Sequence, residues 1–151
     1  MNVLITGITG YIGSRLAPRL QRDGHAVRGL SRHPHPGRHG VPVVAGDAVS
    51  GRGLEEALEG IDVAYFLIHS MERSPNGPFA ARDRAAAENF ARAARAAGTE
   101  RIIYLGGLIP VGGPLSAHLA SRLEVEQTLL AATPSSVALR ASIVVGAGSR
   151  P

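Results

Sequence analysis

Three glycines near the start of the chain stand at a spacing that can hold a phosphate. Gly7, Gly10 and Gly13 follow an apolar run at residues 2–6 and precede or open a helical pattern over residues 11–22. The first glycine permits a tight turn out of a strand, the second lets backbone amides approach a pyrophosphate, and the third allows close helix packing. Amides and the dipole at a helix start then favour the anion. The spacing in this context predicts a dinucleotide-binding loop.

The end of a second apolar run, residues 26–31, indicates which dinucleotide is bound. In dinucleotide-binding folds an acid at this point accepts from a ribose 2′-hydroxyl, whereas an arginine binds a 2′-phosphate. Here the chain has Ser31 followed by Arg32, and no acid lies between Asp23 and Asp47. We therefore expect NADP(H) as the cofactor. The alternative is that Arg32 merely ends a strand in solvent.

The charge pattern also favours an anionic ligand. The formal net charge is +4, and all 16 basic residues are arginine, which excludes any mechanism that needs a lysine. Six arginines lie between Arg15 and Arg38 with a single acid, Asp23, among them. Such a cluster attracts phosphates. We prefer the phosphates of a dinucleotide to a nucleic-acid surface as its ligand.

Composition excludes several other classes of site. The chain of 151 residues has no cysteine, which excludes disulfides, thiolate metal sites and cysteine nucleophiles, and we assign no metal site. No run approaches the roughly 20 apolar residues that span a bilayer. We expect a cytoplasmic protein that binds a small-molecule substrate.

Short apolar runs alternate with helical stretches, as they do where parallel strands are joined by crossover helices. Several of the runs are apolar on both faces, which is typical of a parallel sheet covered by helices. Gly24, Gly60 and Gly98 are placed to end the first three helices. The helix over 79–97 is alanine-rich and has Glu88 four residues before Arg92, a favourable spacing for an ion pair. The expected strands are 2–6, 26–31, 41–45, 63–68, 101–105 and 137–143, and the expected helices are 11–22, 54–59, 79–97 and 116–132.

On these motifs the chain resembles the short-chain dehydrogenase/reductase superfamily, in particular its extended and atypical, NmrA-like branch. The resemblance rests on segments 6–13, 46–47, 65–70, 101–107 and 139–140. It implies an α/β fold, a Rossmann doubly wound parallel sheet with strand order 3-2-1-4-5-6. Residues 1–151 would form one NAD(P)-binding domain.

The resemblance also implies which residues touch the cofactor. Loops after the first three strands would hold the pyrophosphate, the adenosine phosphate and the adenine. Residues after the fourth strand would lie under the nicotinamide-side ribose, with a last group at the end of the fifth strand. A role for Asp47 in forming a turn is an open alternative to its binding the adenine amino group. In that order the residues are Gly7, Thr9, Gly10, Tyr11, Ile12 and Gly13; Ser31 and Arg32; Asp47 and Ala48; Leu67, Ile68 and His69; and Leu105, Gly106 and Gly107.

The chain departs from the superfamily at the active site. Active members usually carry a Tyr-x-x-x-Lys pair on the helix after the fifth strand, and this chain has no lysine. At the corresponding place stand His118 and Arg122, which keep the four-residue spacing. A cation beside the imidazole would keep His118 neutral and able to accept a proton. Alternatively, residues 121–124 form a capping box or Arg122 pairs with Glu126.

The resemblance implies an NADP(H)-dependent oxidoreductase that acts on a small carbonyl or enone. A non-catalytic NADP(H)-sensing domain is one alternative, and an isomerase, dehydratase or cyclase is another. Members usually continue beyond the sixth strand into a substrate lobe, which this sequence, ending at Pro151, lacks. The sequence is a fragment, or catalysis has been lost, or a homodimer completes the site. We expect such a dimer to use helices 79–97 and 116–132, with alanine and leucine on their outer faces.

Overall fold

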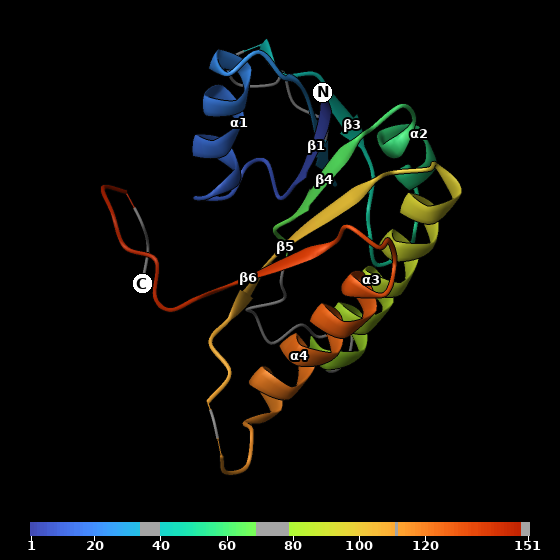
Figure 1. Cartoon of the computed structure of the whole chain (residues 1–151). Coiled ribbons are helices and arrows are strands. Elements are labelled where there is room, and N and C mark those ends of the chain that lie inside the picture. Colours follow the sequence, from blue (N-terminus) through green and yellow to red (C-terminus); the bar gives the residue numbers. More distant parts are fainter. Residues whose placement is uncertain (34–39, 69–78, 111, 149–151) are drawn as a thin grey trace.

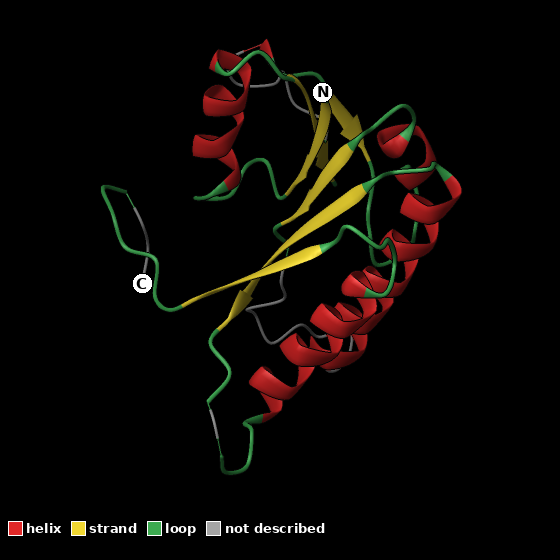
Figure 2. Ribbon diagram, in the orientation of Figure 1, coloured by secondary structure: helices red, strands yellow, loops and turns green. Residues whose placement is uncertain are grey.

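Six parallel strands form the centre of the protein, in the order β3-β2-β1-β4-β5-β6 (Figure 2). A computed structural model of the chain describes residues 1–33, 40–68, 79–110 and 112–148. This order confirms the doubly wound topology predicted from the sequence. The strands are β1 (Asn2–Thr6), β2 (Ala26–Ser31), β3 (Val43–Ala45), β4 (Val63–Phe66), β5 (Arg101–Gly107) and β6 (Val137–Ala141).

Helices cover the two faces of the sheet unequally. Helix α1 lies against one face, and α2, α3 and α4 lie against the other (Figure 1). Glycines with positive φ angles follow the first three helices as predicted, namely Gly24 at 86°, Gly60 at 67° and Gly98 at 71°. The helices are α1 (Gly13–Arg22), α2 (Leu54–Leu58), α3 (Phe79–Ala96) and α4 (Ala117–Leu130).

The core consists of two apolar clusters, one on each face of the sheet. On the α1 face, Val3 and Ile5 of β1 pack with Ala17 of α1. On the other face the cluster is larger, and the rings of Phe66 and Phe90 meet edge to face with centroids 5.1 Å apart. The buried alanines of α3 have small side chains, so this helix packs closely on the sheet. The packing fixes where the strands end, and the loops at those ends carry the candidate site.

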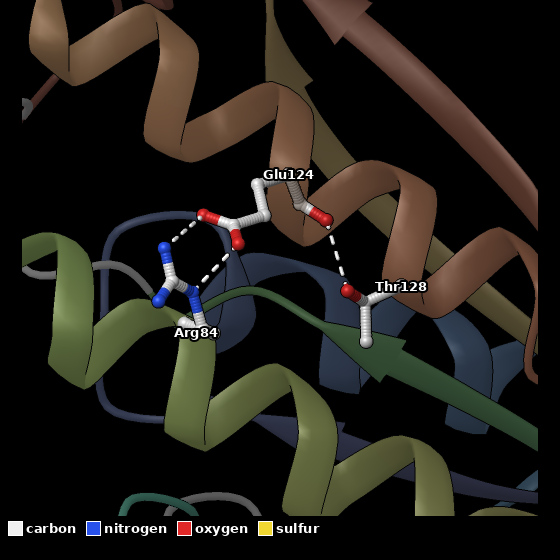
Figure 3. Close-up of polar contacts among 3 residues, drawn as sticks. All are labelled: Arg84, Glu124 and Thr128. Carbon is white, nitrogen blue, oxygen red and sulfur yellow. Dashed lines mark hydrogen bonds and ion pairs between the residues drawn. The ribbon is translucent and has the colours of Figure 1, made fainter.

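Helices α3 and α4 lie side by side and are joined by an exposed ion pair (Figure 3). Arg84 of α3 donates through Nε and Nη2 to the two carboxylate oxygens of Glu124, at 2.6 and 3.1 Å. Thr128, one turn later on α4, donates to the Glu124 carbonyl at 3.0 Å. The exposed residues of α3 are mostly charged, which corrects the expectation that alanine and leucine form its outer face.

The edge strand β6 has one covered face and one exposed face. Its residue Ala138 packs against the larger core cluster beside α4. Side chains alternate along a strand, so Val137 and Leu139 point to the opposite face, where they are 41% and 55% exposed. Ile143, in the segment after β6, is also exposed. No helix among the described residues covers this part of the sheet.

Candidate functional site

The glycine loop has the backbone geometry of a tight turn with one open side. Gly7 has φ +66°, a conformation that favours glycine, and its carbonyl accepts from the amide of Gly10 at 2.9 Å. A Cβ built on Gly10 would meet only the Gly7 carbonyl oxygen, at 3.2 Å, so its outer side is open. A Cβ on Gly13 would collide with that same oxygen and come within 2.9 Å of Ile8 Cα. Gly13 therefore permits close packing of α1 against the loop.

Backbone amides just before α1 are available for an anion. The N-cap residue is Ile12, which makes no side-chain cap, and the first turn has no acidic residue. No described residue accepts a hydrogen bond from the backbone amides of Tyr11 or Ile12. Thr9 and Gly10, just before them, are exposed. Free amides at the positive end of a helix dipole favour a bound phosphate.

Thr6 joins the two strands on either side of the glycine loop, and the sequence reasoning did not identify it. Its hydroxyl donates to the carbonyl of Tyr65 and accepts from the amide of Leu67, both at 3.0 Å. Its side chain is fully buried. These bonds tie the end of β1 to the end of β4, where the order of strands reverses. Ligands of such sheets bind at this point.

Arg32 is exposed at the carboxyl end of β2 and makes no hydrogen bond or ion pair in the part of the chain that the structure describes. Ser31 forms a local turn, because its hydroxyl donates to the His33 carbonyl at 3.1 Å. Arg32 therefore keeps its guanidinium available for a phosphate.

Other arginines of the basic cluster have partners inside the protein. Arg28 donates through Nη1 to the carbonyls of Glu56, Ala57 and Glu59, at 3.1, 3.0 and 2.9 Å, and so caps the end of α2. Arg19 pairs with Asp23 at 3.0 Å. The cluster is thus less available to anions than its composition suggests.

Asp47 shapes the loop after β3. Its Oδ1 accepts from the amide of Val49 at 3.0 Å, and its own amide donates to the Arg52 carbonyl at 2.9 Å. Ala48 is buried. Asp47 therefore forms a turn, which was the open alternative in the sequence analysis. No described residue donates to its second oxygen, Oδ2. An adenine amino group could still use that oxygen.

The loop after β4 begins beside the glycine turn. A Cβ on Gly7 would lie 3.4 Å from the backbone of Leu67, so the two loops are in close contact. Leu67 packs with the α1 cluster and Ile68 with the opposite one. His69, the third residue predicted here, lies outside the described residues.

Arg122 of α4 reaches the end of β5. Its Nη2 donates to the Leu105 carbonyl at 2.9 Å, and its guanidinium lies 5.8 Å from the centre of the Tyr104 ring. A Cβ on Gly107 would be 3.6 Å from Arg122 Nε, so the glycine leaves room beside it. Gly106 is more tightly constrained, because a Cβ there would come within 2.9 Å of the Tyr104 ring.

His118 is exposed on the first turn of α4, and its ring centre is 6.0 Å from that of Phe79 on α3. No described contact joins His118 to Arg122.

Both structural alternatives for this part of α4 are wrong. The N-cap is Ser116, whose hydroxyl accepts from the Leu119 amide, so residues 121–124 lie inside the helix and cannot form a capping box. Glu126 pairs with Arg140 at 2.6 Å instead of Arg122.

Tyr65 of β4 and Tyr104 of β5 are unsuited to act as bases. Burial raises the pKa of Tyr65 above its ordinary value. Burial also raises the pKa of Tyr104; the Arg122 guanidinium lowers it, and the carboxylates of Asp83 and Glu126 raise it. Both hydroxyls therefore stay protonated near neutral pH.

Arg15 of α1 is a second residue that the sequence reasoning missed. Its guanidinium lies over the Tyr11 ring at 3.9 Å and donates to the carbonyl of Tyr11 at 3.1 Å and to that of Ala147 at 2.5 Å. It thereby holds the segment after β6 beside the glycine loop. An arginine two residues after Gly13 gives no sign of this in the sequence, because its partner is 132 residues away.

The residues fit a dinucleotide along the carboxyl edge of the sheet. The open side of Gly10 and the free amides suit a pyrophosphate, Arg32 suits a phosphate on ribose, and Asp47 Oδ2 suits an amino group. No helix among the described residues has the length and hydropathy to span a membrane.

Comparison with known proteins agrees with this geometry. Residues 7–143 match a family described as NAD(P)H-binding. The chain is 33% identical over 150 residues to a ceramide reductase of Caulobacter vibrioides, covering 97% of this chain and 47% of that protein. It is 27% identical to a 2-alkyl-3-oxoalkanoate reductase of Stenotrophomonas maltophilia, covering 99% and 53%. The chain thus spans about half the length of these relatives.

Solved structures show the same fold. A short-chain dehydrogenase/reductase superfamily protein of Agrobacterium tumefaciens with bound NAD superposes with a TM-score of 0.77 at 23% identity, over 93% of this chain and 48% of that one. MoeE5 in complex with UDP-glucuronic acid and NAD gives 0.73 at 27% identity, over 93% and 54%. The finer assignment to the NmrA-like branch stays a prediction. The chain belongs to the NAD(P)H-binding family, whose model matches residues 7–143.

Proposed function

We propose that this chain binds NADP(H) and that the protein reduces a carbonyl or enone of a small molecule. One observation carries the proposal: the glycine loop exposes unbonded amides and an open Gly10 at the edge where Arg32 is free. Amides and a fixed cation at one sheet edge complement a dinucleotide with an extra phosphate. We also propose that residues 1–151 form a single domain.

The cofactor supplies a hydride when it is bound, and the chain supplies binding and orientation. Gly7, Thr9, Gly10, Tyr11 and Ile12 would line the pyrophosphate, with Gly13 keeping α1 close. Leu67, Ile68 and His69 would lie beside the nicotinamide-side ribose, next to Gly106 and Gly107.

The relatives favour reduction of a carbonyl compound. Ceramide reductase and 2-alkyl-3-oxoalkanoate reductase are named as reductases. A Streptomyces griseus relative, 35% identical over 106 residues, is named a (4-alkanoyl-5-oxo-2,5-dihydrofuran-3-yl)methyl phosphate reductase. Because solved neighbours contain NAD, the preference for NADP(H) rests on Ser31 and Arg32 alone.

Arg122 and His118 are our candidates for the polar groups near the substrate. A guanidinium carries five N–H donors, and Arg122 spends one on the Leu105 carbonyl, so others remain for a ribose or a carbonyl oxygen. His118 is exposed and would deliver a proton to that oxygen. His118→Gln should then lower turnover about a hundredfold while leaving the Kd for NADPH unchanged.

Titration of the protein with NADPH and with NADH by calorimetry tests the cofactor part. We expect NADPH to bind at least about tenfold more tightly, since the enzyme offers a cation and no acid at the ribose. Loss of NADPH absorbance with a panel of ketones and enones then tests the reaction. Equal affinity for both cofactors would contradict the NADP(H) preference, and absence of binding would contradict the whole proposal.

The second candidate function is an NADP(H)-sensing domain without turnover. It is favoured by the contacts of His118 and Arg122, which engage Phe79 and Leu105 and not each other. Tight NADPH binding with no absorbance loss on any substrate would support this function over the first.

A homodimer that pairs α3 and α4 is the arrangement we propose for a catalytic form of this chain. Paired helices from two copies would add surface near the end of β5. The outer face of α3 is mostly charged, so its contacts would be polar. Sedimentation at increasing protein concentration should show a dimer, and a monomer with rapid turnover would contradict the proposal.

A further inference from the structure

Asn89 of α3 binds the loop after β3 from a distance of forty residues along the chain. Its side-chain nitrogen Nδ2 donates to the carbonyl of Ala48 at 3.1 Å and to that of Val49 at 2.8 Å. Both bonds are partly buried. Loop 46–53 is the one that would carry the adenine, so the contact joins a helix of the core to a binding loop.

The orientation of this amide is set by a neighbouring arginine. Arg92, one turn later on α3, donates to Asn89 Oδ1 at 2.5 Å instead of pairing with Glu88 as its spacing predicts. An arginine can only donate, so the oxygen of the amide must face Arg92. Nδ2 is therefore directed at the two carbonyls of the loop.

Asn89 and Asp47 hold one peptide unit from its two sides. The carbonyl of the Ala48–Val49 peptide accepts from Asn89, and the amide of the same peptide donates to Asp47 Oδ1. A peptide is planar, with its C=O and N–H pointing in opposite directions, so two such bonds fix its plane. The same bonds fix the rotation of the Asp47 carboxylate.

Fixing that carboxylate decides where its second oxygen lies. Oδ1 is occupied by the Val49 amide, and Oδ2 has no described donor. A hydrogen-bond acceptor binds its ligand more tightly when its side chain is already ordered in the free protein, because ordering a side chain on binding costs free energy. The loop also passes close to Asn89 at Gly51, where an added Cβ would lie 3.5 Å from Asn89 Cγ.

We propose that Asn89 is a positioning residue for the adenine end of the cofactor. It acts through the Ala48–Val49 peptide, which orients Asp47 Oδ2 toward the adenine amino group. The inference rests on the proposed function, since it assumes that the loop after β3 receives the adenine.

The test compares how tightly one variant binds each of the two halves of the cofactor. Asn89→Leu keeps the approximate shape of the side chain and removes both donors. Binding of adenosine 2′,5′-bisphosphate and of reduced nicotinamide mononucleotide is measured by calorimetry. We expect the bisphosphate to bind about tenfold more weakly and the mononucleotide to bind as it does to the unchanged protein, because two neutral hydrogen bonds are lost at one end only.

Asn2→Leu is the matched control. Asn2 also donates through Nδ2 to a backbone carbonyl, that of Gly60 at 2.9 Å, but it lies at the opposite, amino end of β1. The Asn2→Leu variant should have the same ratio of bisphosphate affinity to mononucleotide affinity as the unchanged protein. If Asn89→Leu does not fold, Asn89→Asp is measured in the same way; it keeps the shape and the Arg92 contact but cannot donate to the carbonyls, and the same change in ratio is expected.

The outcomes separate this inference from the proposed function. A selective loss of bisphosphate affinity supports the positioning role. Equal weakening of both halves, or no change in either, overturns it and leaves the proposed function standing. An unchanged protein that binds neither the bisphosphate nor NADPH overturns the proposed function, and with it this inference.

Discussion

Strands β1 and β6 belong to the same parallel sheet, but the protein covers them differently. Val3, Leu4 and Ile5 of β1 are at most 2% exposed, because α1 packs on one face and the other helices on the opposite face. Val137 and Leu139 of β6 are 41% and 55% exposed, since the described helices cover only their strand's other face (Figure 1).

The polar contacts of the two regions differ in the same way. Around β1 the loops are closed by hydrogen bonds to the neighbouring strand, such as the two bonds of the buried Thr6 hydroxyl. Around β6 a buried carboxylate, Glu126, holds Arg140 by bonds of 2.6 and 3.1 Å while the apolar side chains beside it stay exposed. The described residues around β1 are thus closed by partners within the chain, whereas β6 exposes apolar side chains.

The largest expected effect is on cofactor binding at the glycine loop. Gly10→Val should weaken NADPH binding more than a hundredfold, on the order of 3 kcal/mol, because the branched side chain fills the open side where the pyrophosphate would lie. Gly10→Ala should have a smaller effect in the same direction. Calorimetry measures the loss, and circular dichroism checks that the domain is folded. Unchanged affinity would remove this loop from the site.

The next prediction tests the difference in coverage directly. Leu4→Ala should lower the free energy of unfolding by about 3 kcal/mol, because the side chain is fully buried. Leu139→Ala, the same change on β6, should lower it by less than about 0.5 kcal/mol. Urea unfolding of the two variants provides the comparison. A large cost for Leu139→Ala would mean that a second copy or another segment covers β6 in solution.

A third prediction concerns the cofactor preference. Arg32→Ala should weaken NADPH binding about tenfold and leave NADH binding unchanged, because only NADPH carries the phosphate that this cation would contact. Arg95→Ala at the far end of α3 is the control, since it changes the net charge equally. If both cofactors weaken in the same proportion, Arg32 does not discriminate between them.

The smallest expected effect is at the junction of α3 and α4. Arg84→Ala removes the ion pair with Glu124, but both side chains are exposed and screened by solvent, so the melting temperature should not change measurably. Sedimentation of the variant gives a further result. A shift from dimer to monomer would show that Arg84 lies in the interface we propose for these helices.

Much of the fold could be predicted from local patterns. The runs at 2–6 and 26–31 match β1 and β2 to the residue, and the glycines after the first three helices end them as expected. The observed start of a helix differs from the predicted one where neighbouring residues belong to a turn. Helix α1 begins at Gly13 and not at residue 11, because residues 10–12 belong to the glycine turn.

The sequence by itself determined the elements, the order of the sheet through its likeness to a known superfamily, and the glycine loop. These features follow from hydrophobic period, glycine geometry and neighbours in sequence. The tertiary structure decided which polar groups meet across long separations. Arg28 caps α2, Glu126 pairs with Arg140 and not with Arg122, and Asn89 bonds the loop after β3. The hydrophobic period of a helix or strand shows which of its faces is buried, but not which distant carbonyl or carboxylate lies opposite it.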